Sequence, residues 1–268
     1  MDHFIIWRII QGLGTCVGPV VARTIIEDVF GDNDEQRQYA HRAVWIGIIA
    51  SPAIALFVSS IFLRSAGIIS VSLLLTLTGF LMSSFAYLCI PETRPSFISA
   101  KNITWPTISN ELRKLLTNRI FMLPVLASSF SLAGAFAYLT DIAFVFNHTL
   151  GMTTGVDVWL TINAAMLAVI FYWDNKLVKQ MDPRSRNVLT VRALLVRWIV
   201  TLVLLSMAYA DHAGRWPIMM LLFIYHLSLG LILAKLQADA MHVAAGMQST
   251  ASSLYGALLN SGVLLGTA

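Results

Sequence analysis

The chain places an arginine and a glutamine inside an otherwise apolar run, residues 4–22. Arg8 and Gln11 lie one turn apart, on the same face of a predicted helix. A guanidinium in hydrocarbon is costly, so such a residue persists where it faces a bundle interior or a wet cavity. Gly12 and Gly14 let a neighbouring helix approach closely. The pattern indicates a buried polar site on a membrane helix and suggests a pathway; the alternative is that Arg8 is an interfacial anchor whose head group reaches water.

Three further charges, Arg23, Glu27 and Asp28, lie at the end of the same apolar run. Arg23 and Glu27 are four residues apart, so a local ion pair at a helix end is one interpretation.

The composition predicts that these residues sit on membrane helices. Apolar residues make up 57% of the chain and charged residues 12%, against about 45–50% and about 25% in soluble domains. Eight apolar segments come near the roughly 20 residues that a membrane span needs. They are 4–24, 43–63, 68–90, 120–140, 158–174, 192–210, 217–236 and 246–266. An all-α integral membrane bundle follows, because each span must satisfy its own backbone polar groups.

Several polar and aromatic side chains inside these segments are candidates for a substrate cavity. They are Phe130, Phe136, Tyr138, Asn163 and His226. Aromatic faces stack on flat ligands, but aromatic residues in membrane helices more often pack or anchor at interfaces. Asn163 has helix–helix hydrogen bonding as its alternative. His226 is either a hydrogen-bonded interhelical residue or a titrating group.

The basic residues divide the connections into two sets. Lys and Arg gather around residues 37–42, 94–119 and 176–192, and the opposite connections hold little beyond Arg64 and Arg215. The first set is therefore predicted to be cytoplasmic, with the N-terminus outside. The net charge of +4 reflects this loop bias, and no clustered basic face for nucleic acid is visible. Cys16 and Cys89 stand alone in apolar spans, which disfavours a disulfide or a metal site.

A polar stretch divides the chain once. We expect residues 1–90 to form the remainder of an N-terminal helix bundle with three spans, and residues 119–268 a C-terminal bundle with five. Residues 91–118 form the central cytoplasmic loop between them, and Glu111–Leu116 inside it predicts a short amphipathic helix at the membrane surface.

Five segments, in order along the chain, resemble drug:proton antiporters of the major facilitator superfamily, in the bicyclomycin/chloramphenicol-resistance (Bcr/CflA) group. They are Arg8–Gly14, Val21–Phe30, Pro91–Thr93, Phe130–Tyr138 and Ala245–Leu254. They are similar, in that order, to the family's fourth-helix motif, the end of that helix, the end of the sixth helix, the seventh helix and the entry to the eleventh. Their order and spacing match the family across nearly the whole chain.

The resemblance implies a major facilitator helix bundle in which about eight of twelve transmembrane helices are retained, without the first three and the last. It implies a role in proton coupling for Arg8, with Gln11, Gly12 and Gly14 on the same pathway. It also implies that Asp28 belongs, with Arg23 and Glu27, to the charges that latch the cytoplasmic gate. The implied partners are protons, an amphipathic drug-like substrate and the bilayer of a bacterial inner membrane, with no cofactor and no nucleic acid.

Three functions follow as hypotheses. The first is proton-coupled multidrug efflux by alternating access. The second is a truncated or split-gene transporter fragment that is inactive alone, or that works with a separately encoded fragment supplying the missing helices. The third, an integral membrane enzyme, is disfavoured because no Ser/His/Asp or paired His/Asp set falls at a common depth.

Overall fold

The computed structural model describes residues 2–93, 104–145, 156–178, 181–210, 214–244 and 246–267, and these form helices joined by short connections. In chain order the helices are α1 (Asp2–Phe30), α2 (Asp34–Cys89), α3 (Trp105–Thr117), α4 (Arg119–Phe144), α5 (Val156–Val178), α6 (Pro183–Ala210), α7 (Arg215–Val243) and α8 (Gln248–Thr267). The predicted all-α class is confirmed in this part of the chain. Each of the eight apolar segments overlaps one of these helices.

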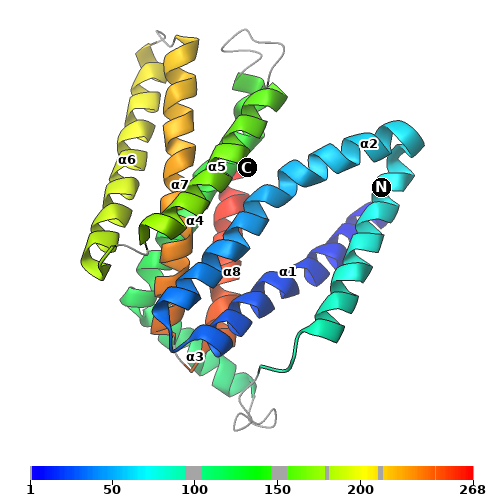
Figure 1. The fold of residues 1–268 in the computed structure, drawn as a ribbon, viewed down its shortest axis with the longest axis vertical. Coiled ribbons are helices and arrows are strands. Elements are labelled where there is room, and N and C mark those ends of the chain that lie inside the picture. Colours follow the sequence, from blue (N-terminus) through cyan, green and yellow to red (C-terminus); the bar gives the residue numbers. More distant parts are fainter. Residues whose placement is uncertain are drawn as a thin grey trace.

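The second and third predicted spans form a single bent element, α2, instead of two helices separated by a loop. Gly67 has a φ of +71°, a conformation that glycine adopts without a Cβ clash. The hydroxyl of Ser70 donates to the carbonyl of Gly67 at 2.6 Å. Figure 1 shows the two arms of α2 meeting at a sharp bend. Arg64, predicted in a connection, therefore lies inside α2.

Four described segments are long and apolar enough to cross a membrane: Ile69–Cys89, Arg119–Ile142, Arg184–Ala210 and Trp216–Val243. The number of membrane-crossing helices, eight by sequence, stays a prediction. Within the central loop, the helix predicted over Glu111–Leu116 is present as part of α3.

The helices converge at one end of the molecule, which we call the base. Here α1 ends and α2, α4, α6 and α8 begin (Figure 1). Toward the other end, α1 and α2 lean away from α5, α6 and α7. The main apolar core lies among α4, α7 and α8, with the fully buried side chains of Phe121, Ile232 and Tyr255.

Small residues bring α4 and α8 into close contact within this core. A Cβ added at Gly262 would lie 2.6 Å from the backbone oxygen of Ser129, and one at Gly266 would overlap the carbonyl of Ala133. The Ser129 hydroxyl donates to the carbonyl of Leu258 across the same contact at 2.7 Å. Glycines four residues apart on one face thus let two backbones touch.

Candidate functional site: a buried polar network at the base

The first turns of α2 carry four polar side chains on one face. Asn33 begins the helix, because its Oδ1 accepts hydrogen bonds from the backbone N–H groups of Glu35 and Gln36. The four residues are Arg37, Gln38, His41 and Arg42. Their spacing places them on one helical stripe, where three are buried, with exposed fractions of 4% for Arg37, 0% for His41 and 3% for Arg42. Arg37 and Arg42 are predicted from the sequence to lie in a connection, whereas the structure places both in a helix that packs on its neighbours.

The inner half of this face joins α1 to α7 through His41. Its Nε2 lies 2.8 Å from Glu27 Oε1 on α1, and its Nδ1 lies 2.8 Å from Gln237 Nε2 on α7. Arg37 lies 3.9 Å from the second Glu27 oxygen and directs Nη1 to Nδ1 of His242 at 3.1 Å. Two residues of α2 therefore bind α7 directly.

The outer half joins α2 to α5 and α6. Arg42 forms an ion pair with Asp174 of α5, with 2.8 Å between Nε and Oδ2. Arg186 of α6 donates from Nη1 to Oε1 of Gln38 at 3.0 Å. Buried charges are tolerated when they are paired, and Arg42 and Asp174 pair with each other. We call these side chains, together with those of the inner half, the base network.

The three predicted gate charges separate in the structure. Glu27 lies in the base network, but Arg23 is not paired with it as a local ion pair. The Arg23 guanidinium lies 5.1 Å from the ring centroid of Tyr255 on α8, a cation–π contact. Asp28 turns outward and accepts a hydrogen bond from Thr93 Oγ1 at 3.3 Å. Burial raises the pKa of Asp28, and the Thr93 bond opposes that rise.

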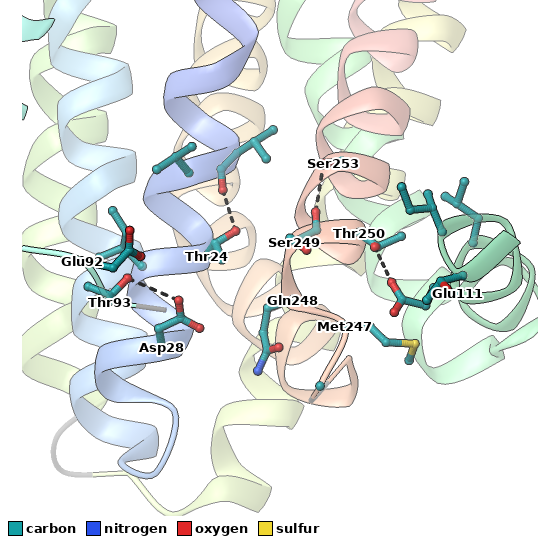
Figure 2. Close-up of a pocket in the computed structure, with 17 residues that line it drawn as sticks. Thr24, Asp28, Glu92, Thr93, Glu111, Met247, Gln248, Ser249, Thr250 and Ser253 are labelled. Atoms are coloured by element: carbon teal, nitrogen blue, oxygen red, sulfur yellow. Dashed lines mark hydrogen bonds between the residues drawn. The ribbon is translucent and has the colours of Figure 1, made fainter. Parts of the chain in front are cut away.

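Asp28 faces a cavity of about 620 Å³ beside the base. Figure 2 shows its lining, which comes from the end of α1, residues 92–93, α3 and the start of α8. Glu111 of α3 accepts a hydrogen bond from Thr250 of α8 at one side of it. This contact fixes α3 against the base. None of the predicted cavity aromatic residues lines this space.

Two of the predicted substrate-cavity residues, Tyr138 and His226, meet between α4 and α7, and the third, Asn163, lies one turn from their neighbour Trp159 on α5. Tyr138 packs on His226 with ring centroids 4.6 Å apart. The indole of Trp159 donates to the Tyr138 hydroxyl at 2.8 Å, and Asn163 Nδ2 donates to the Trp159 carbonyl at 2.8 Å. Within the described residues, Asn163 Oδ1 and His226 Nδ1 are buried without a hydrogen-bond partner. We call Tyr138, Trp159, Asn163 and His226 the aromatic cluster.

The other two predicted cavity residues differ in exposure. Phe130 is 68% exposed on the outer side of α4, which separates it from the buried cluster, and Phe136 is half-buried.

The opening motif lies in α1, far from the base. Gln11, Gly12 and Gly14 are exposed, and the side chain of Arg8 lies outside the described structure. No described atom lies within 4 Å of a Cβ added at Gly12 or Gly14. The pathway role of these four residues stays a prediction.

Most of the base network, and a further buried arginine outside it, are not predicted from the sequence. Arg197 of α6 donates to the carbonyls of Tyr225 and Ser131, at 2.9 and 2.8 Å, and lies over the Tyr225 ring. Arg197 and Asp174 could have been recognised as candidates, because each is a charged residue within a predicted apolar segment and intramembrane charges are rare. In the described residues, no group of three or more His, Cys, Asp or Glu side chains is placed to hold a metal ion.

Comparison with known proteins gives two findings. The sequence profile of the Major Facilitator Superfamily matches residues 2–267. The chain is 25% identical over 254 residues to an uncharacterized MFS-type transporter, YdgK, of Bacillus subtilis (strain 168). The match covers 94% of this chain and 61% of that relative, so the chain spans less than two thirds of its length. No solved structure matches.

Proposed function

Because the chain belongs to the major facilitator superfamily, we propose that it is part or all of a secondary active transporter that exchanges protons for amphipathic drug-like compounds. Its place would be the inner membrane of a bacterium, crossed several times. The motifs at Arg8–Gly14 and Ala245–Leu254 support the drug:proton antiporter group.

The observation that carries the proposal is the base network. One face of α2 binds α5, α6 and α7 through the Arg42–Asp174 pair, the Arg186–Gln38 bond and the His41–Gln237 bond. Each contact is short-ranged and polar, so it can break when the side chains gain water and reform when they lose it. A network of this kind suits a transporter in which two groups of helices close and open at the cytoplasmic side.

The aromatic cluster is the proposed substrate contact. Tyr138, Trp159 and His226 supply ring faces, and the unpartnered acceptors Asn163 Oδ1 and His226 Nδ1 suit a ligand with N–H or O–H donors. Binding by stacking and a few hydrogen bonds tolerates substrates of varied shape, as multidrug efflux requires.

The experiment is extrusion of a fluorescent amphipathic dye from an efflux-deficient bacterial host. The proposal expects proton-driven extrusion that collapses with an uncoupler, and reduced extrusion by a chain carrying Asn163→Leu. The matched control is Leu205→Ala on the exposed side of α6, which should leave extrusion unchanged.

A second candidate is a fragment that transports nothing alone and works with further helices supplied by another chain. The second arm of α2 favours it, because no part of the apolar segment Ile69–Cys89 is buried within the described structure. Phe80, Phe85 and Leu88 are each more than 60% exposed. Dye extrusion distinguishes the two candidates: the fragment gives none alone and gains it on co-expression with a second chain that supplies the further helices.

A further inference from the structure

His41 occupies a special position in the base network, because both of its ring nitrogens are bonded and its side chain is fully buried. Glu27, on one side, belongs to α1, which is directly connected to α2. Gln237, on the other side, belongs to α7. The imidazole therefore links α1 and α2 to α7 through its two hydrogen bonds.

The partners define which nitrogen carries the proton. A carboxylate only accepts hydrogen bonds, so Nε2 facing Glu27 must be N–H. The amide nitrogen of Gln237 only donates, so Nδ1 facing it must present its lone pair. With the Gln237 amide placed in this way, the bonding fits a neutral imidazole. A second proton on Nδ1 would place two donors against each other at 2.8 Å, so the amide would have to turn its oxygen to the ring or move away from it.

Charged groups from four helices belong to the same network as His41. From its own helix, Arg37 and Arg42 lie nearby, and α6 contributes Arg186. The acidic partners in the described network are Glu27 of α1 and Asp174 of α5.

The remaining charged groups on these helices lie apart from the ring. On α7, His242 faces Arg37, and Lys235 and Asp239 pair with each other at 2.6 Å. On α1, Arg23 faces Tyr255 and Asp28 faces the outer cavity. A proton added to His41 would thus bring a fourth positive charge to a network whose described residues already hold three arginines and only two carboxylates.

We propose that His41 is a proton-binding site that controls the contact between α2 and α7. The neutral ring accepts the Gln237 hydrogen bond and keeps the base closed, and a second proton on Nδ1 breaks that bond and separates the two helices. Separation lets water reach the imidazolium, which then pairs with Glu27 alone. The inference deepens the proposed transport and rests on it, since opening the base is the step that the proton would control.

The test measures the distance across the base between α2 and α6, the helix that packs beside α7. Spin labels are attached at Tyr39→Cys and Ser185→Cys, two exposed positions on α2 and α6, after Cys16 and Cys89 are replaced by Ala. The full chain is studied in lipid nanodiscs from pH about 7.5 to about 5.5, the range in which an imidazole titrates. We expect the label distance to lengthen on acidification, and this change to be lost in His41→Gln.

Two further variants make the result specific. Gln237→Glu places a carboxylate against Nδ1, which accepts from the imidazolium, so acid should no longer lengthen the distance. His242→Gln removes the other histidine of the network and should keep the response. Because Gln237→Glu leaves the histidine in place, it tests the proposal even when His41→Gln fails to fold, which thermal unfolding of each variant reports.

Three results would overturn the proposal: a distance that does not change with pH, one that shortens in acid, or a response that persists in His41→Gln. These outcomes are separate from failure of the transport proposal. If tetraphenylphosphonium changes the label distance and pH does not, the transport proposal stands without His41. If pH acts through His41 while no dye is extruded, the site stands without the transport.

Discussion

Arg42 of α2 and Asp174 of α5 form an ion pair whose 2.8 Å contact is almost wholly removed from solvent, with side-chain exposures of 3% and 4%. The pair joins the first turns of one helix to the last turns of another that lies far along the sequence. Because both charges are buried, each is stabilised by its partner and not by water.

Removing one member of this pair should be strongly destabilising. Arg42→Met leaves Asp174 as an uncompensated buried charge, and we expect a loss of about 3–5 kcal/mol in the free energy of unfolding. The double variant with Asp174→Leu should recover most of that loss. Equilibrium unfolding in mixed micelles measures both, and Lys235→Ala, at a more exposed pair, should cost less than about 1 kcal/mol. An Arg42→Met chain as stable as the parent would contradict this prediction.

Replacing Gly262 should disrupt the α4–α8 contact. The Cβ and methyl groups of Gly262→Val would overlap the Ser129 backbone, and overpacking of this kind typically costs about 1–3 kcal/mol. Gly14→Ala is the matched control, because no described atom lies within 4 Å of its Cβ. Alanine is the better helix former, so this variant should gain up to about 1 kcal/mol. The midpoint of thermal unfolding in nanodiscs distinguishes the two.

Removing the Tyr138 hydroxyl should lower the stability of the fold, because the indole N–H of Trp159 loses its hydrogen-bond acceptor. Tyr138→Phe removes the acceptor of the indole N–H, and an unsatisfied buried donor costs about 1–3 kcal/mol. Tyr209→Phe, at a side chain that is 85% exposed, should be neutral. Unfolding followed by tryptophan fluorescence reports the difference. Equal stability of the two variants would mean that the indole finds another acceptor.

Arg8 is predicted to matter for proton coupling and not for folding. In vesicles holding the chain together with helices that complete a twelve-helix bundle, Arg8→Leu should insert at the parent level yet lose drug-driven proton release, because it removes the positive charge that acts on a nearby carboxyl group. Arg8→Lys keeps the charge without the planar fork and should rescue partly. If Arg8→Leu couples like the parent, the residue is an interfacial anchor.

The predicted orientation places the base and the central loop in the cytoplasm. In a background without Cys16 and Cys89, single cysteines at Ser99 and Ser185 should resist an impermeant maleimide in intact cells. One at Thr149 should react readily. Labelling at Ser99 from outside would reverse the topology.

The sequence by itself determined that the chain is mostly helical and which segments form the apolar part of each helix. A run such as 120–140 is apolar at nearly every position, and a segment of that length satisfies its backbone only as a helix in a bilayer. The family was also accessible, because Arg8–Gly14 and Ala245–Leu254 are local motifs that need no tertiary information.

Only the tertiary structure decided which polar side chains meet. From the sequence, Arg37 and Arg42 are interpreted as loop charges, because a count of charges does not show how the start of a helix packs. Nothing in the sequence indicates a role for His41. Their partners Gln237 and Asp174 lie on distant helices, and their pairing depends on the rotation of each helix about its axis and on the height at which the helices cross. Those two quantities are set by packing of whole faces, so the base network exists only in the folded bundle.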